Sequence, residues 1–149
     1  KFKNKDKLFF VDKYYKPELP LNLTKYLLKF ANSSIDVSDG LIDDLAKMIN
    51  RQSLSFHLFE NKIPVSNKLS NFIKKQRLNK INLISNGDDY QVLFTADINK
   101  ARIIQKASKT TGIKITKIGK IVSGKDRSLI FDEKGKQIRA KSKGYIHRF

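Results

Sequence analysis

The apolar positions of this chain switch repeatedly between helical and strand spacing. Apolar residues three and four positions apart predict a helix from Leu23, with Asn22 as its N-cap, and further helices over residues 41–49, 67–73 and 98–108. Alternating apolar residues and short apolar runs predict strands over residues 34–38, 54–59, 90–96, 113–122, 129–131 and 137–140.

The interleaving of these helices and strands, without an internal repeat, predicts an α+β fold. We expect a single layered domain with a mixed β-sheet covered by helices. Residues 16–20 hold two prolines, which favour an extended connector. We therefore interpret residues 1–20 as a linker or domain junction and residues 21–149 as the folded domain.

Length and composition narrow the class of protein. A chain of 149 residues suits one domain, and 40% apolar with 30% charged residues is typical of globular rather than disordered proteins. No apolar run approaches the ~20 residues that span a bilayer, so no membrane role is expected. The absence of cysteine excludes disulfides and zinc-thiolate sites, and the first residues do not resemble a secretory signal. The expected location is cytoplasmic.

The net charge of +17 leaves two interpretations open. Strongly basic proteins attract phosphate polyanions, which would suit a nucleic-acid-binding module. The basic residues are mostly lysines, however, and they spread from Lys1 to Arg148. A solvated basic surface is the favoured interpretation, and a nucleic-acid partner is not favoured.

The acidic residues are clustered. Of only 14, four fall within residues 36–44 and two are adjacent at Asp88 and Asp89. Like charges so close cost energy unless cations or hydrogen-bond donors offset them. A site for Mg²⁺ and phosphate is one physical reason for such clusters, because Mg²⁺ takes hard oxygen ligands.

The first candidate motif covers residues 35–41. On a strand, Asp36 and Ser38 would project to one face, and Asp39 would lie near the N-terminus of the next helix. Helix N-terminal amides favour phosphate oxygens, Gly40 permits close backbone approach, and the carboxylates could hold metal ions. The alternative is an ordinary capping turn, with Asp39 or Ser38 as the N-cap and with Asp43 and Asp44 complementing the helix dipole.

Two further segments carry candidate chemistry. In residues 85–94, a glycine-containing turn that enters a strand could aim Asp88 into a cleft, or could be a simple turn. In the tail, Tyr145 and Phe149 could stack on a cationic aromatic ligand or merely pin the chain end. His57 is expected at the surface.

Taken in order, these segments resemble the thiamine-monophosphate kinase family. Asp-Val-Ser-Asp-Gly-Leu at 36–41 resembles the family's Asp-[Ile/Val]-Ser-Asp-Gly-Leu motif, and 86–94 resembles Gly-Gly-[Glu/Asp]-Asp-Tyr-[Glu/Gln]-Leu-Leu-Phe. The tail is similar to Gly-[Phe/Tyr/Trp]-x-His-Phe, and 14–17 to a Tyr-x-[Arg/Lys]-Pro junction. The resemblance implies a C-terminal domain like that of aminoimidazole ribonucleotide synthetase, in the same superfamily.

The resemblance also implies roles for individual residues. Asp36 and Asp39 would bind Mg²⁺, Ser38 would contact ATP phosphate, and Asp88 and Tyr145 would contact thiamine. The implied reaction is ATP-dependent phosphorylation of thiamine monophosphate to the diphosphate. It would require an N-terminal domain that this chain lacks, and a homodimer is expected at full length. The alternatives are another ATP-dependent enzyme of the superfamily or a basic nucleic-acid-binding module.

Overall fold

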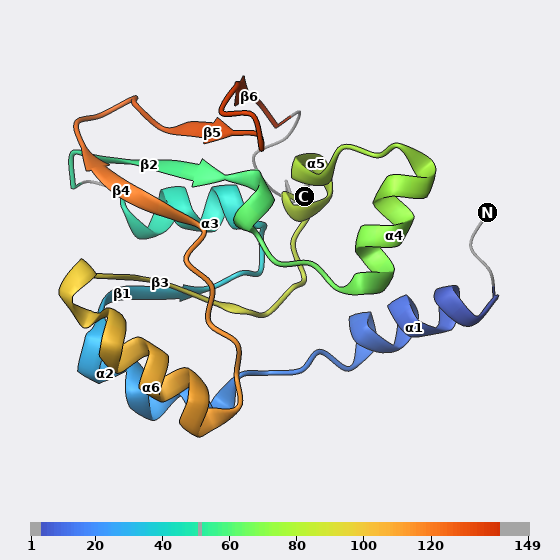
Figure 1. Cartoon of the computed structure of the whole chain (residues 1–149), viewed down its shortest axis with the longest axis horizontal. Helices are drawn as coiled ribbons and strands as arrows, with labels where there is room; N and C mark the ends of the chain where they lie inside the picture. Colours follow the sequence, from blue (N-terminus) through green and yellow to red (C-terminus); the bar gives the residue numbers. More distant parts are fainter. Residues whose placement is uncertain (1–3, 51, 141–149) are drawn as a thin grey trace, which may run out of the picture.

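The computed structural model describes residues 4–50 and 52–140, in which helices alternate with the strands of two β-sheets (Figure 1). The strands are short, as is usual for a small domain. They are β1 (Ala31–Asp36), β2 (Leu54–Phe59), β3 (Val92–Ala96), β4 (Gly119–Ser123), β5 (Leu129–Phe131) and β6 (Gln137–Ile138).

The larger sheet is mixed and has the order β4-β2-β5-β6. Its central strand β2 runs antiparallel to β4 and parallel to β5, and β5 runs antiparallel to β6. The smaller sheet pairs β1 with β3 in antiparallel fashion. These sheets confirm the expected α+β class with a mixed sheet.

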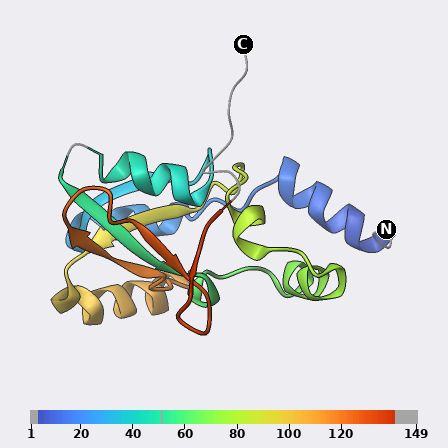
Figure 2. The ribbon, with the colours of Figure 1, turned by 90° about the horizontal axis from the view of Figure 1, so that it is seen from above.

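Helices lie on both sides of the smaller sheet and beside the larger one. They are α1 (Asn4–Tyr15), α2 (Thr24–Phe30), α3 (Leu41–Met48), α4 (Asn67–Gln76), α5 (Lys80–Ile84) and α6 (Ala101–Thr111), with single 3-10 turns η1 (Leu21–Leu23), η2 (Glu60–Lys62) and η3 (Ile98–Lys100). Figure 1 shows α2 and α6 on the side of β1 and β3 that faces away from the larger sheet. Both views place α1, α4 and α5 at the same end of the molecule (Figure 2).

The larger hydrophobic core joins α3 to the larger sheet. Helix α3 buries an apolar stripe spaced like a helical face, and this stripe meets the inner face of β2. The buried members of this core are Val37, Leu41, Ile42, Leu45, Ile49, Phe56, Leu58, Ile63, Ile81, Ile84 and Ile130. Because the core holds α3 from one side, the start of α3 has a fixed position relative to β1 and β2.

A second, smaller core lies between α2, α6 and the smaller sheet. Its buried residues are Leu23, Phe30 and Ala107. The rings of Phe30 and Phe94 are 5.2 Å apart between centroids, so α2 packs directly on β3. The β1–β3 ladder therefore lies between the two cores, with Leu93 packed against the larger core and Phe94 against the smaller one.

The expected strand over 113–122 is wrong in its first half. Regular pairing begins at Gly119, although the Phe59 amide also donates to the Ile118 carbonyl at 2.9 Å. Ile113 and Ile115 pack on the smaller core, whereas Ile118 packs on the larger one. The alternation therefore reflects a connection that buries side chains in two cores rather than a strand.

Two predictions at the N-terminal side also differ from the structure. Asn22 lies inside the 3-10 turn η1, so it is not the N-cap of α2, whose cap is Leu23. Residues 4–15 form helix α1, which the apolar spacing did not indicate, while residues 17–20 lie outside helices and strands. No helix in the described part of the chain is long and apolar enough to cross a membrane.

Candidate functional site

The two acidic motifs meet where the β1–β3 ladder ends. Asp36, the last residue of β1, is paired with Val92, the first of β3. Beyond them the Val37 amide donates to the Gln91 carbonyl at 2.9 Å, and the Tyr90 amide donates to the Val37 carbonyl at 2.8 Å. The ladder thus continues into both loops and holds the two motifs together.

The loops approach each other so closely that glycine is required. The Asp88 amide donates to the Ser38 carbonyl at 2.8 Å. A Cβ on Gly87 would lie 1.8 Å from that carbonyl oxygen, and a Cβ on Gly40 would lie 2.3 Å from the Ser85 carbonyl oxygen. Gly40 also has φ of 122°, a conformation that other residues rarely adopt. Both glycines therefore have a physical role in joining the motifs.

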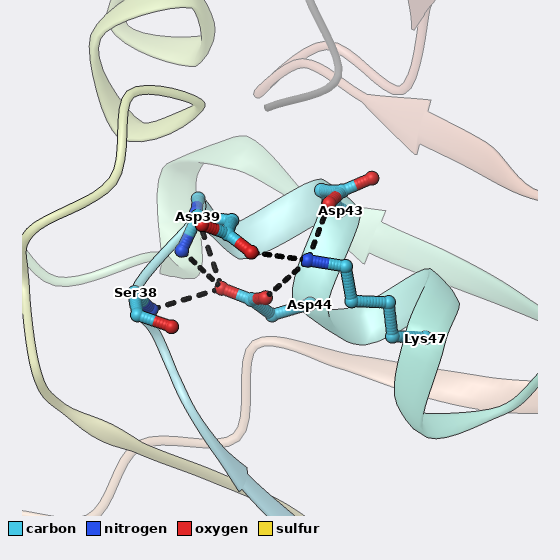
Figure 3. A network of polar contacts seen from close by, with 6 residues as sticks. Ser38, Asp39, Asp43, Asp44 and Lys47 are labelled. Atoms are coloured by element: carbon cyan, nitrogen blue, oxygen red, sulfur yellow. Dashed lines mark hydrogen bonds and ion pairs between the residues drawn. The ribbon is translucent and has the colours of Figure 1, made fainter. Parts of the chain in front are cut away.

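A buried carboxylate organises the loop that carries Ser38 and Asp39. The side chain of Asp44, only 1% exposed, accepts hydrogen bonds at one oxygen from the amides of Ser38 (3.0 Å), Asp39 (3.0 Å) and Gly40 (3.1 Å) (Figure 3). Amides before a helix have no partner within the helix, so a carboxylate in the first turns can satisfy them. Asp44 therefore does more than complement the helix dipole, because its side chain fixes three successive amides. The predicted N-cap is wrong, since the N-cap of α3 is Gly40 and not Asp39 or Ser38.

Lys47 neutralises the acidic residues at the start of α3. Its Nζ lies 2.5 Å from Asp39 Oδ2, 2.7 Å from Asp43 Oδ2 and 3.3 Å from Asp44 Oδ1 (Figure 3). Hydrogen bonds to Asp39 and then to Asp43 raise the pKa of Lys47 above its ordinary value. The sequence analysis missed this lysine, although its spacing of four from Asp43 and three from Asp44 signals a shared helix face.

The donor chemistry of this group fits a hard cation. One carboxylate oxygen from each of Asp39, Asp43 and Asp44 lies within 4.8 Å of the others. Oxygen donors at such spacing suit Mg²⁺, and the Lys47 ammonium already lies among them. Asp36, the other expected metal ligand, is not a member of this group.

Asp36 lies instead on the side of the second motif. It is exposed at the end of β1, and its charge acts on Tyr90. The Tyr90 hydroxyl donates to Asp88 Oδ1 at 3.3 Å, and the negative charge of Asp88 is the main reason that the pKa of Tyr90 is raised. The strand that was expected to carry Asp36 and Ser38 on one face ends at Asp36, so Ser38 belongs to the following loop.

The second motif has an unusual backbone. Asp88 and Tyr90 have φ of 66° and 51°, in the left-handed region that non-glycine residues seldom occupy. Between them, desolvation of the Asp89 carboxylate and the adjacent charge of Asp88 raise the pKa of Asp89. Strained backbone and a perturbed carboxylate often coincide at functional sites.

The remaining candidates are Tyr145 and His57. Tyr145, with the rest of its tail motif, falls outside the described residues. His57 is half-buried on β2 and packs edge-on against Phe131, with ring centroids 5.5 Å apart. It therefore belongs to the larger sheet and not to the meeting point of the motifs.

The curated relatives of this chain described here are all thiamine-monophosphate kinases. No family model matches the chain. A thiamine-monophosphate kinase of Buchnera aphidicola subsp. Acyrthosiphon pisum is 34% identical over 143 residues, covering 93% of this chain and 42% of that protein. A thiamine-monophosphate kinase of Escherichia coli strain K12 is 27% identical, covering 96% of this chain and 43% of that protein.

Solved structures agree with the sequence matches. The structure described as AaThiL complexed with AMPPCP and TMP has a TM-score of 0.72 and 26% identity, covering 99% of this chain and 43% of that chain. Thiamine monophosphate kinase from Aquifex aeolicus gives a TM-score of 0.65 and 25% identity, covering 93% of this chain and 43% of that chain. HypE of E. coli, a hydrogenase maturation protein, shares the fold at 15% identity, with a TM-score of 0.64 over 83% of this chain and 39% of that chain.

This chain spans less than half of each relative described above. The matches nevertheless cover nearly all of this chain, and they agree in sequence and in fold. Over nearly all of its length, the chain is therefore similar in sequence and in fold to one part of the thiamine-monophosphate kinases.

Proposed function

We propose that this chain is the part of a thiamine-monophosphate kinase that organises phosphate, metal and substrate. The complete enzyme would transfer the γ-phosphoryl group of ATP to thiamine monophosphate and form thiamine diphosphate. The observation that carries the proposal is the backbone contact between Ser38 and Asp88, which joins the two family motifs at one end of the β1–β3 ladder. Phosphoryl transfer depends mainly on the positioning of the reactants and on charge neutralisation. Two acidic loops that backbone hydrogen bonds hold side by side are suited to both tasks.

The first motif would handle metal and ATP phosphate. Asp36 and Asp39 are the proposed ligands of Mg²⁺, and Ser38 is proposed to contact ATP phosphate. Mg²⁺, when bound, would neutralise charge on the phosphate oxygens. The hydrogen bonds from the Ser38 and Asp39 amides to Asp44 hold this loop in one conformation, which supports a positioning role.

The second motif and the tail would handle the substrate. The thiazolium ring of thiamine carries a positive charge, so a carboxylate at Asp88 and an aromatic ring at Tyr145 are suitable partners. Asp88 is exposed beside the first motif, which leaves its carboxylate accessible to a ligand. The relative described as complexed with AMPPCP, an ATP analogue, and TMP supports this pair of substrates.

The rest of the enzyme is part of the same proposal. We propose that residues 1–20 join the domain of residues 21–149 to an N-terminal domain, and that the chain alone is inactive. Helix α1 already contacts this domain, because Lys68 Nζ lies 4.2 Å from the centre of the Phe9 ring. A homodimer at full length and a cytoplasmic location complete the proposal.

Replacing Asp36 or Asp39 with asparagine should lower the turnover number of the full-length protein by at least about tenfold, equivalent to ~1.4 kcal/mol of transition-state stabilisation. Each change removes one negative charge from a proposed metal ligand while keeping the size of the side chain. The measurement is the rate of ADP release with saturating thiamine monophosphate, ATP and Mg²⁺.

Asp126→Asn is the matched control, because Asp126 is exposed and asparagine tolerates its positive φ of 58°. This control should retain normal turnover. Near-normal turnover of both Asp36→Asn and Asp39→Asn would refute the assignment of these residues as metal ligands.

A further inference from the structure

The Lys47 ammonium lies among the three carboxylates near the start of α3 that could otherwise hold a metal ion. Its nitrogen is within hydrogen-bond distance of Asp39 and Asp43, and within 3.3 Å of Asp44 (Figure 3). A lysine ammonium is a compact point charge with several donors, so it can neutralise carboxylates as a metal ion would. A cation that binds Asp39 at Oδ2 would therefore compete with Lys47 for that oxygen.

The three carboxylates are not equivalent partners of this lysine. Asp44 is buried, and its other oxygen already holds three loop amides. The side chains of Asp39 and Asp43 are 31% and 35% exposed, so their oxygens can exchange one cation for another. Asp44 would keep its place during such an exchange, and Asp39 and Asp43 would change partner.

The side chain of Lys47 is free to move out of its ion pairs with Asp39 and Asp43 into solvent. Its side chain is 45% exposed, and lysine has a flexible four-carbon stem that reaches water easily. Exposed ion pairs of lysine contribute little to stability, because water and salt solvate both charges. A divalent cation offers twice the charge and binds oxygen ligands directly, so it can displace the ammonium.

We propose that Lys47 is an internal counter-cation of Asp39, which a divalent metal must displace and which therefore weakens metal binding. This inference rests on the proposed role of Asp39 as a metal ligand. It adds a function for a residue outside the two motifs: Lys47 sets the metal concentration at which Asp39 becomes occupied, and it limits repulsion between Asp39 and Asp43 when no metal is bound.

The test is a titration of the 149-residue chain with Mn²⁺, monitored by the electron paramagnetic resonance signal of free Mn²⁺. Lys47→Met should bind Mn²⁺ about three- to tenfold more tightly than the unaltered chain, because the competing ammonium is gone. Lys47→Arg keeps the charge and should bind with an affinity close to that of the unaltered chain.

The matched control is Lys106→Met on α6. Lys106 is exposed and forms no ion pair within residues 4–50 and 52–140, so this change removes one positive charge without altering the site. Its Mn²⁺ affinity should equal that of the unaltered chain. Equal tightening by Lys106→Met and Lys47→Met would overturn the proposal, because the effect would then be one of net charge.

Asp39→Asn separates this inference from the proposed function. If Asp39→Asn weakens Mn²⁺ binding but Lys47→Met leaves it unchanged, Lys47 is no competitor and only the inference fails. If Asp39→Asn leaves Mn²⁺ binding unchanged, the proposed metal role of Asp39 fails, and the inference fails with it. Absence of Mn²⁺ binding by both the unaltered chain and Lys47→Met also overturns the inference.

Discussion

Replacing Asp44 with alanine is expected to lower the free energy of unfolding by about 3 to 5 kcal/mol, a large part of the total stability of a small domain. The change removes the acceptor of three loop amides, from Ser38, Asp39 and Gly40. Each buried donor left without a partner costs roughly 1 to 3 kcal/mol, and partial access of water reduces the sum. Urea denaturation followed by far-ultraviolet circular dichroism measures the effect.

Asp43→Ala is the matched control for this prediction. Asp43 lies one position earlier on α3, and Figure 3 shows its ion pair with the exposed Lys47. Loss of this ion pair should cost less than about 1 kcal/mol. Equal losses of stability in the two variants would mean that the amide contacts of Asp44 do not stabilise the loop.

Replacing Gly87 with alanine is expected to destabilise the fold by about 3 kcal/mol, through overpacking and the loss of loop hydrogen bonds. The new Cβ would overlap the Ser38 carbonyl, so the loops would have to separate. Separation breaks the hydrogen bond from the Asp88 amide to Ser38 and weakens the one from Tyr90 to Val37. Hydrogen exchange at the Asp88 and Tyr90 amides should accelerate, which nuclear magnetic resonance detects residue by residue.

Gly135→Ala provides the comparison for Gly87→Ala. Gly135 has φ of 77° but nothing within 4 Å of an added Cβ, so alanine there meets backbone strain without overlap. The expected cost is about 1 kcal/mol, and exchange at Asp88 and Tyr90 should not change. If Gly87→Ala were no more destabilising than Gly135→Ala, the close packing of the two loops would be disproved.

Most helices and strands, and the positions of both motifs, followed from the sequence. The stripe of α3 and the residues Phe56 and Leu58 of β2 are buried as their spacing predicts. Ser55, on the expected polar face of β2, is nevertheless buried as well. The motif residues Asp39 and Asp88 were recognisable because short acidic segments beside glycine are rare in so basic a chain. Local pattern was sufficient wherever one face of an element packs on one core.

The contacts that build the site depended on the tertiary structure. The approach of Gly87 to Ser38 joins residues far apart in sequence, so no local pattern encodes it. From the sequence, Asp44 resembles an ordinary partner of the helix dipole. Its burial and its three amide contacts arise only when the loop folds back over α3, so the local sequence does not reveal them. The spacing of residues 113–118 resembles that of a strand because packing on two cores imposes the same alternation that one sheet would.

The most direct test of the proposed kinase activity is the phosphorylation reaction of the full-length protein with ATP and Mg²⁺. ATP consumption is measured with thiamine monophosphate and, in parallel, with the substrates of aminoimidazole ribonucleotide synthetase and selenophosphate synthetase. We expect ATP consumption to depend on thiamine monophosphate, and ADP and thiamine diphosphate to accumulate in equal amounts. Absence of ATP consumption with thiamine monophosphate, or turnover of one of the other substrates in its place, would contradict the proposed activity.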